Sequence, residues 1–447
     1  MKQANSDRKT LRFLFLGYVV LALIGTITLK FQACTTNGIS FIDALFTSAS
    51  AISMTGLIVK NTASDFTLYG QIAILILIQV GGLGYMGFGA FLYVLVRKKI
   101  GFTEKNLLKQ SLIYPSMEGI IKFLKKVLIF VFLAEFVGAV FLSLRFMLDM
   151  DIVTAIWYGV FHSVASFNNA GFSLFENGLT DFAEDTWINM VVSTLILTGG
   201  IGYFALLEVY FFHQKRLANL SLHTKIVLIS TLFFTLFATI IIFLFEYTNK
   251  NTLGELNLFN KILSSYFAAV NYRSGGYATL DFSEFKDASL FFGSLFMVIG
   301  GAPGGTSGGI KVTTVVVLLV YAYWTIRGGR IRIFNYEIPQ DVISKAFVIG
   351  VSSATCIIFY VIILSLLESE HRFLPLLFET VSAFATVGVS VGNGDNLSLS
   401  ALFSDESKMI IIIMMITGRI GVYAFLLSVF MQDKEKFIRY PQGKVYL

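Results

Sequence analysis

The chain has 447 residues, of which 55% are hydrophobic, 15% aromatic and only 14% charged. A soluble domain carries roughly 25% charged residues, so this composition excludes an ordinary cytosolic enzyme. The hydrophobicity also excludes intrinsic disorder, and it argues against nucleic-acid binding despite the net charge of +6. Two cysteines, Cys34 and Cys356, form no metal or redox motif. The composition therefore predicts an integral membrane protein.

The chain begins with a polar, basic segment, residues 1–12, and the apolar run behind it lacks a small-residue cleavage site. We therefore expect that run to be a retained transmembrane helix. A hydrocarbon core about 30 Å thick needs about 20 apolar residues of helix. Eight stretches meet this requirement: 13–29, 69–96, 120–147, 187–212, 224–246, 288–326, 342–366 and 409–431. Between the members of each pair lies a shorter, semi-apolar stretch, at 39–53, 152–166, 258–271 and 374–385. These four stretches are either amphipathic surface loops or re-entrant helices.

The distribution of charge predicts which side of the membrane each segment faces. With the N-terminus inside, the inner segments contain 23 Lys and Arg residues and the outer segments only nine. Because membrane proteins retain Lys and Arg on the cytoplasmic side, both termini are expected in the cytoplasm. The outer segments contain 19 acidic residues, which are either ordinary solvated side chains or an acidic vestibule that concentrates cations.

One pattern recurs four times along the chain. Each short stretch ends at a glycine: Gly56, Gly171, Gly276 and Gly388. A second glycine-containing motif follows 24 to 30 residues later, beginning at Gly81, Gly199, Gly300 and Gly418. The predicted fold is therefore all-α, with four membrane-pore-membrane repeats, eight transmembrane helices and four short pore helices around a pseudo-fourfold ion pore. Its predicted order is a cytoplasmic N-terminus (1–12), repeats A (13–97), B (120–212), C (224–327) and D (342–432), cytoplasmic linkers (98–119, 213–223 and 328–341) and a cytoplasmic C-terminus (433–447).

The glycine loops carry the predicted chemistry. Non-helical backbone at membrane depth must be buried in protein or line a water-filled cavity, where its carbonyl groups can replace the hydration shell of an alkali cation. Glycine suits such a loop because it adopts backbone angles closed to other residues and has no Cβ. No loop carries a carboxylate within the two residues before its glycine, which favours K⁺ over divalent ions. The predicted selectivity filter, with K⁺ at the four glycines, comprises Met54, Thr55, Gly56, Asn169, Ala170, Gly171, Ser274, Gly275, Gly276, Thr386, Val387 and Gly388.

The third loop also contains Arg273, three residues before its glycine. A guanidinium group that pointed into a cation path would oppose conduction, so we expect Arg273 to point behind the filter. There it could pair with an acid such as Glu379 or donate to loop carbonyls.

Four membrane-pore-membrane units in one chain, each with one filter glycine, resemble the Trk/Ktr/HKT superfamily of potassium transporters. The resemblance spans nearly the whole chain and is greatest to KtrB-type membrane subunits, because the extra N-terminal helices usual in Trk-type members are absent. It implies K⁺ uptake across a bacterial plasma membrane, often stimulated by Na⁺, by a homodimer in which each subunit has its own pore. It also implies a cytosolic RCK-type (KtrA-like) regulatory ring. Any nucleotide would bind that separate subunit, and this chain would carry no cofactor besides K⁺ or Na⁺.

The second helix of the third unit is interrupted by six glycines and a proline within residues 300–309. In a helix each Gly costs about 1 kcal/mol and Pro about 3 kcal/mol. A nucleotide-binding P-loop is not expected, because Ile310 separates Gly309 from Lys311. The segment is either a kink for close packing or, as the resemblance implies, an intramembrane gating loop. The predicted gating residues are Gly300, Gly301, Pro303, Gly304, Gly305, Thr306, Ser307, Gly308, Gly309, Lys311 and Arg419.

Arg419 replaces the second glycine of the recurring motif in the fourth unit. A charged residue inside a membrane helix is costly and usually faces a cavity or a partner. Arg419 should therefore face the same axis as the interrupted segment, whose free carbonyls can accept from its guanidinium group. We hypothesise that Arg419 latches this segment shut across the pore. Lys311 could act similarly, or its side chain could reach the inner membrane interface.

Other classes of function have less support. The four histidines are scattered and form no metalloprotease motif, and no nucleophile elbow is present, so the chain is not expected to be an enzyme. His162 is expected to be a packed structural residue. Glu135 and Glu208, inside predicted membrane helices, could relay protons in a symporter that works by alternating access, which is the alternative function.

Overall fold

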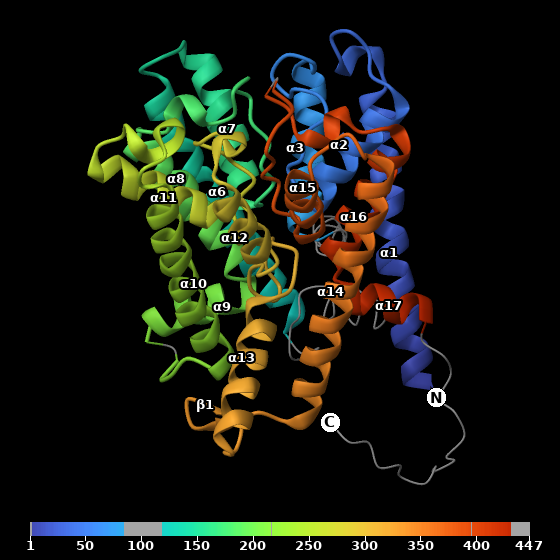
Figure 1. Ribbon diagram of the computed structural model, residues 1–447, viewed down its shortest axis with the longest axis vertical. Helices are drawn as coiled ribbons and strands as arrows, with labels where there is room; N and C mark the ends of the chain where they lie inside the picture. Colours follow the sequence, from blue (N-terminus) through green and yellow to red (C-terminus); the bar gives the residue numbers. More distant parts are fainter. Residues whose placement is uncertain (1, 85–118, 216, 395, 431–447) are drawn as a thin grey trace.

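The computed structural model describes residues 2–84, 119–215, 217–394 and 396–430, and these residues are mostly helical (Figure 1). Four long helices are α1 (Lys2–Leu29), α6 (Ile120–Phe146), α10 (Leu222–Glu246) and α14 (Gln340–Leu367). Each is followed by a short helix: α2 (Phe41–Ser53), α7 (Ile152–Phe167), α11 (Leu258–Asn271) and α15 (Phe373–Ala385). The helices that come next are α3 (Leu68–Gly82), α8 (Thr186–Gly200), α12 (Asp287–Met297) and α16 (Asp405–Ile420).

Three further helices, α9 (Tyr203–His213), α13 (Val312–Arg327) and α17 (Val422–Phe430), continue the chain after α8, α12 and α16. Single helical turns lie at η1 (Gln32–Cys34), η2 (Thr180–Phe182), η3 (Lys250–Gly254), η4 (Phe282–Glu284) and η5 (Leu399–Leu402). Strands β1 (Arg332–Ile333) and β2 (Tyr336–Glu337) pair antiparallel between α13 and α14. Figure 1 shows the four short helices in the upper half of the molecule and this hairpin at the opposite end.

Within the described residues, three helices (α6, α10 and α14) are each long and apolar enough to cross a membrane. A fourth span results if α8 and α9 are counted together. This number is lower than the eight spans predicted, because the other segments divide into shorter apolar helices or run into residues that are not described. The long helices expose large apolar side chains, such as Ile129, Leu133 and Phe136 of α6, as lipid-facing helices do.

Breaks in the second helices of the units are more frequent than predicted, since the sequence indicated a break only in the third unit. Helices α8 and α9 meet at an angle of 103°. The residue between α16 and α17 is Gly421, with φ 91°, and Gly202, with φ 89°, precedes α9. Glycine reaches such positive φ angles without a steric penalty, whereas other residues rarely adopt them. In the second and fourth units the last glycine of the recurring motif therefore separates two helices.

The first glycine of the motif has a different role, because it allows a close approach between helices. A Cβ atom on Gly81 would collide with the carbonyl oxygen of Ile52 near the end of α2. The same collision would occur between Gly199 and Phe167 of α7, and between Gly418 and Phe384 of α15. In the first, second and fourth units, the second helix thus packs directly against the C-terminal carbonyls of the short helix in its own unit.

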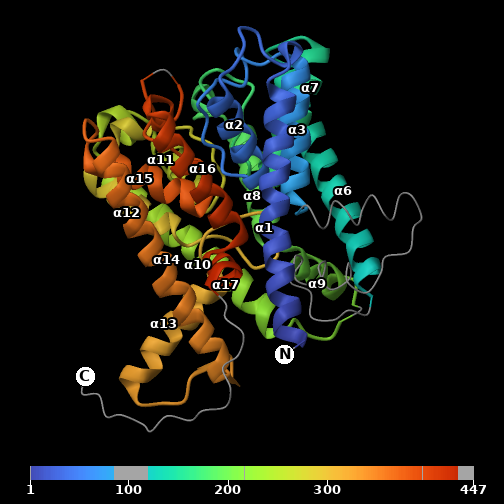
Figure 2. The ribbon, with the colours of Figure 1, turned by 90° about the vertical axis from the view of Figure 1, so that its right-hand side faces the viewer.

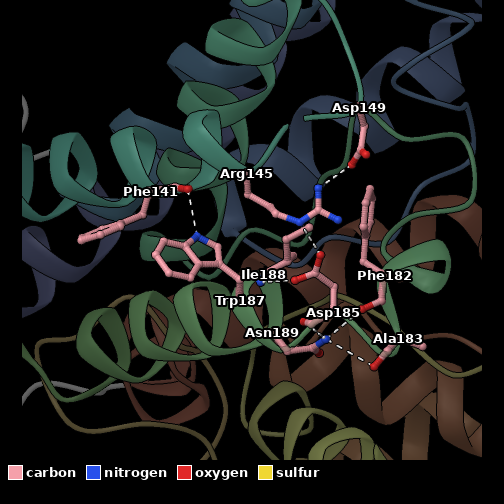
Figure 3. Close-up of polar contacts among 9 residues, drawn as sticks. All are labelled: Phe141, Arg145, Asp149, Phe182, Ala183, Asp185, Trp187, Ile188 and Asn189. Carbon is pink, nitrogen blue, oxygen red and sulfur yellow. Dashed lines mark hydrogen bonds and ion pairs between the residues drawn. The ribbon is translucent and has the colours of Figure 1, made fainter. Parts of the chain in front are cut away.

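The second unit is tied together by ion pairs at the C-terminal end of α6 (Figure 3). Arg145 of α6 lies 2.6 Å from Asp149 and 2.6 Å from Asp185, which precedes α8. Asp185 also caps α8, because its Oδ1 accepts from the amide of Ile188 at 3.0 Å. The indole of Trp187 donates to the carbonyl of Phe141 at 3.0 Å. These contacts fix the position of α8 relative to α6.

Candidate functional site: four glycine loops above a glycine-rich segment

Each short helix ends at a loop in an unusual conformation; we call residues 54–57, 169–172, 274–277 and 386–389 the glycine loops. The residue two positions before each glycine has positive φ: Met54 (57°), Asn169 (58°), Ser274 (99°) and Thr386 (51°). The glycines themselves also have positive φ: Gly56 (90°), Gly171 (69°), Gly276 (77°) and Gly388 (89°). Non-glycine residues rarely adopt such angles, and they persist only where the surrounding structure holds them.

The four glycines meet around one axis. A Cβ atom on Gly171 would lie 2.7 Å from Gly276 Cα and 3.1 Å from Gly56 Cα. A Cβ atom on Gly388 would lie 3.0 Å from both Gly276 Cα and Gly56 Cα. Real Cβ atoms essentially never come so close to backbone atoms, so only glycine fits at these positions. Gly171 and Gly388 each neighbour the other two glycines, which places the second and fourth loops opposite each other.

Side chains of the short helices hold the loops in place. The amide of Gly56 donates to Ser50 Oγ at 3.0 Å, and that of Gly388 donates to Ser382 Oγ at 3.1 Å. In the third loop the amide of Tyr277 donates to Asn271 Oδ1 at 2.9 Å. Each acceptor stands six residues before its donor. These bonds engage loop amides with side chains of the short helices, and they do not use the backbone carbonyls of the glycines.

Contacts between loops complete the ring. Ser274 Oγ donates to the carbonyl of Thr386 at 2.8 Å, and the Tyr277 hydroxyl donates to the carbonyl of Phe172 at 3.0 Å. Ile58 and Ser398 are joined by two hydrogen bonds, of 2.9 and 3.0 Å. The residues outside the predicted filter that make these bonds were missed, because contacts between distant units leave no signal in the spacing of one unit.

A cavity of about 530 Å³ lies on one side of the ring and is lined by all four glycines. Its wall carries the side chains of two exposed acids, Glu176 and Asp281, together with several asparagines. None of the described residues that line this cavity is basic. Its electrostatic potential therefore favours cations over anions at the entrance to the ring.

The glycine-rich segment, residues 300–311, lies on the other side of the ring, between α12 and α13. Its two ends pair with each other, since the amide of Gly300 donates to the carbonyl of Ile310 at 2.9 Å. Asn169 Nδ2 approaches Ser307 Oγ at 3.5 Å, and a Cβ atom on Gly308 would collide with the Thr386 side chain. The segment thus contacts the second and fourth glycine loops directly.

The break between α8 and α9 provides acceptors for this segment. The carbonyl of Gly200 accepts from Ala302 N at 2.9 Å, and that of Gly199 accepts from Thr306 N at 3.2 Å. In the reverse direction, Tyr203 N donates to the carbonyl of Gly304 at 3.2 Å. A continuous helix would have used these groups internally, so the unpredicted break in the second unit is what anchors the segment of the third.

Arg419 contacts the segment at the point that the sequence indicated. Its guanidinium group donates to the carbonyl of Thr306 and, at 2.9 Å, to the carbonyl of Gly81 in the first unit. Tyr203 donates to the neighbouring carbonyl of Gly82 at 3.0 Å. The side chain of Lys311 donates to the carbonyl of Ser307, so the suggestion that Lys311 reaches the inner interface is wrong. Both cations are held by backbone carbonyls of the segment.

Arg273 does point away from the ring, but the suggested pairing with Glu379 is wrong. Its guanidinium group donates to the carbonyl of Thr231 in α10 at 3.1 Å. Among the described residues, Glu379 instead accepts from the amide of Ser400 at 3.0 Å. Because α10 lies beside α11, its buried threonines Thr231 and Thr235 are the nearer source of acceptors for Arg273.

The two acids inside membrane helices accept hydrogen bonds from neutral groups. Glu135 accepts from Asn168 Nδ2 at 2.9 Å and from Gln79 Nε2 at 3.3 Å. Glu208 accepts from the amide and hydroxyl of Ser221 at 2.9 and 2.6 Å, and so caps α10. Asn168 lies beside the predicted filter residue Asn169, but its partnership with Gln79 and Glu135 spans three helices and was missed.

Comparison with known proteins agrees with this architecture. The family model described as "TrkH: Cation transport protein" matches residues 7–440. The chain belongs to the TrkH family of cation transport proteins. It is 37% identical to the Ktr system potassium uptake protein B of Bacillus subtilis (strain 168), over 97% of this chain and 95% of that protein. It is 31% identical to the potassium/sodium uptake protein NtpJ of Enterococcus hirae, over 100% of this chain and 99% of that protein.

The fold has a counterpart among solved structures. The crystal structure of the potassium transporter TrkH from Vibrio parahaemolyticus matches with a TM-score of 0.75 and 16% identity, over 94% of this chain and 85% of that chain. Membership of the TrkH family confirms the predicted resemblance and identifies the chain as a multi-pass membrane protein of a transporter family, not of an enzyme family.

Proposed function

We propose that this chain transports K⁺ into the cell across the plasma membrane, through a pore whose selectivity filter is formed by the four glycine loops. The observation that carries the proposal is the meeting of Gly56, Gly171, Gly276 and Gly388 around one axis, at the base of a cavity lined by acids and no bases. A cation entering that cavity would meet a ring of backbone with no side chains in the way.

The chemistry of the loops favours an alkali cation. Backbone carbonyls replace a hydration shell without adding a formal charge, whereas divalent ions usually require carboxylates. No carboxylate stands in the two positions before any of the four glycines. The names of the relatives agree with this choice, since one is a potassium uptake protein and another a potassium/sodium uptake protein. We therefore infer K⁺ as the transported ion, with Na⁺ as the ion that could stimulate transport.

The glycine-rich segment is proposed as the gate. It contacts two of the loops from the side opposite the cavity, and Arg419 fastens it to the first unit through the carbonyls of Thr306 and Gly81. Glycine permits this segment to change its backbone angles at little steric cost. In the proposed closed state Arg419 holds the segment across the ion path, and release of Arg419 opens it.

The cavity faces outward in this proposal, and both termini lie in the cytoplasm. A homodimer with one pore in each subunit and a cytosolic RCK-type ring as the nucleotide-binding partner complete the proposed assembly. The name of the Bacillus relative, a protein of a "Ktr system", supports partner subunits. The alternative, a proton-coupled symporter, is not favoured, because Glu135 and Glu208 are engaged by neutral hydrogen-bond donors on neighbouring helices.

Uptake of ⁸⁶Rb⁺ into transport-deficient cells tests the proposed filter. Gly56→Ser should abolish uptake, because its Cβ would lie 2.7 Å from the carbonyl oxygen of Ala170. Gly38→Ser is the matched control, since Gly38 also has positive φ (76°) but has open space around it. Wild-type uptake by a well-folded Gly56→Ser variant would refute the filter assignment.

A further inference from the structure

His162 lies on α7, nine residues before Gly171, and is completely buried. Its ring is surrounded by aromatic rings, with centroid distances of 5.0 Å to Phe175, 5.8 Å to Phe146 and 5.9 Å to Phe161. These ring contacts alone would be enough for a residue whose only role is packing. Both ring nitrogens, however, also make specific hydrogen bonds, and these determine the tautomer.

The partners of the two nitrogens differ in kind. Nδ1 lies 2.8 Å from the carbonyl oxygen of Tyr158, which can only accept, so Nδ1 carries the proton. Nε2 lies 3.3 Å from the amide nitrogen of Leu174, which can only donate, so Nε2 is the acceptor. The hydroxyl of Ser173, 3.0 Å from Nε2, then donates as well. The ring is therefore neutral, with a single lone pair directed at residues 173 and 174.

Those two residues belong to the ion path, because they directly follow the second glycine loop. Ser173 lines the outer cavity together with Gly171. The carbonyl of Phe172, the residue directly after Gly171, accepts from the Tyr277 hydroxyl at 3.0 Å. The backbone just past Gly171 is thus held between His162 and Tyr277.

The fourth unit uses the same position. Glu379 stands nine residues before Gly388, is fully buried, and accepts from the amide of Ser400 at 3.0 Å. The equivalent residues of the other two units provide no such acceptor. Thr47 donates to the carbonyl of Asp43 in its own helix, at 2.9 Å, and Phe267 is apolar. Buried acceptors therefore stand behind the second and fourth loops, which lie opposite each other across the axis.

We propose that His162 is a positioning residue for ion selectivity: its neutral Nε2 holds the strand after Gly171 at the distance from the axis that discriminates K⁺ from Na⁺. The inference rests on the proposed filter. A carbonyl ring discriminates between ions only as far as its position is held. Loss of the Nε2 acceptor leaves the amide of Leu174 and the hydroxyl of Ser173 without this partner, and the strand is then free to shift.

Two near-isosteric variants separate the roles of the ring nitrogens. Asn places its amide nitrogen where Nδ1 lies, so His162→Asn keeps the bond to Tyr158 but loses the acceptor. Gln places its amide oxygen where Nε2 lies, so His162→Gln keeps the acceptor for Leu174. In liposomes containing purified protein, the K⁺ to Na⁺ flux ratio should fall about tenfold in His162→Asn, the change expected for one net hydrogen bond. In His162→Gln it should stay within about twofold of wild type.

Equal losses in both variants would overturn the proposal, because they would assign the effect to ring packing. Unchanged ratios in both would overturn it too. Gly171→Ser, measured in parallel, separates this result from failure of the proposed filter, which is refuted only if that variant also keeps its flux and ratio. If His162→Asn yields no folded protein, Ser173→Ala tests the same hydrogen bond. A several-fold fall in the K⁺ to Na⁺ flux ratio would support the proposed role of His162, and a wild-type ratio would overturn it.

Discussion

Single residues in this protein act mainly through backbone carbonyls. Arg419, Lys311 and Arg273 are all partly or fully buried, and each donates to a carbonyl oxygen and pairs with no carboxylate of the described residues. A buried cation without a counter-ion is expensive unless its donors are satisfied. Broken helices supply such acceptors, because the carbonyls near a helix end have no partner in the helix. The proposed gate and its cationic contacts therefore depend on the same breaks.

Arg419 gives the sharpest test at this scale. Arg419→Gln is expected to raise Rb⁺ flux about tenfold, because a neutral, shorter side chain loses charge-assisted bonds, each worth about 1.5–3 kcal/mol, to the segment and to Gly81. Flux is measured with purified protein in liposomes. Arg145→Gln serves as the control, because Arg145 pairs with Asp149 and Asp185, away from the glycine-rich segment. A folded Arg419→Gln variant with unchanged or lower flux would rule out the latch.

Whole elements are joined at their ends rather than along their lengths. The N-termini of three short helices are capped by side chains, Ser40 for α2, Asp151 for α7 and Asn257 for α11. The C-termini of all four short helices lead into the glycine loops. The helix dipole of each short helix points its negative end at the ring, which favours a cation there. The carbonyls of Gly199 and Gly200 at the end of α8 accept from the glycine-rich segment, and Gly421, with positive φ, redirects the chain after α16.

The tie between α6 and α8 can be tested by removing Asp185, which both caps α8 and pairs with Arg145. Asp185→Ala should lower the free energy of unfolding by about 1–2 kcal/mol, whereas Asp185→Asn, which keeps a capping oxygen, should lose less than half of that. Thermal unfolding in detergent measures both. Arg372→Ala removes a highly exposed pair, 3.7 Å from Asp287, and should change little. A larger loss in the Asn variant than in the Ala variant would contradict this account.

At the scale of the whole molecule, the two ends differ in charge. The lining of the cavity above the ring includes the acids Glu176 and Asp281, whereas the opposite end carries the exposed arginines of the hairpin region, including Arg327 and Arg330. Figure 2 shows this hairpin projecting beyond the ends of α13 and α14, on the side of the molecule where α1 begins. Such asymmetry is what the positive-inside rule requires of a protein inserted in one orientation.

Cysteine labelling tests the orientation. In a background with Cys34→Ala and Cys356→Ala, Asn251→Cys should react with a membrane-impermeant maleimide added to intact cells, and Arg330→Cys should react only after permeabilisation. Both positions are exposed, and they lie at opposite ends of the molecule. Labelling of the Arg330→Cys variant in intact cells would reverse the proposed orientation and, with it, the outward-facing cavity.

Much of the candidate site was predictable from local sequence. The four loop glycines, the glycine-rich segment and the direction of Arg419 follow from spacing alone. A glycine indicates, at its own position, a backbone angle or a close approach that other residues do not allow. The partners of Arg273 and Lys311 did not follow, and neither did the breaks after Gly200 and Ile420. These depend on which carbonyl of a distant unit lies nearest, and no local pattern records that distance.

The sequence by itself determined that the chain is a membrane protein, which end of each span carries basic charge, and where the backbone needs glycine. These properties arise from the hydrophobicity, charge and steric demand of individual residues, so they can be read position by position. The repeats predicted one shared axis for four glycines that lie at least 105 residues apart along the chain. Only the tertiary structure decided which loops neighbour each other around that axis, that α8 breaks to anchor the segment of another unit, and that His162 faces the second loop. Each of these depends on packing between units, because the free energy of such a contact is set by both surfaces together and not by either sequence segment alone.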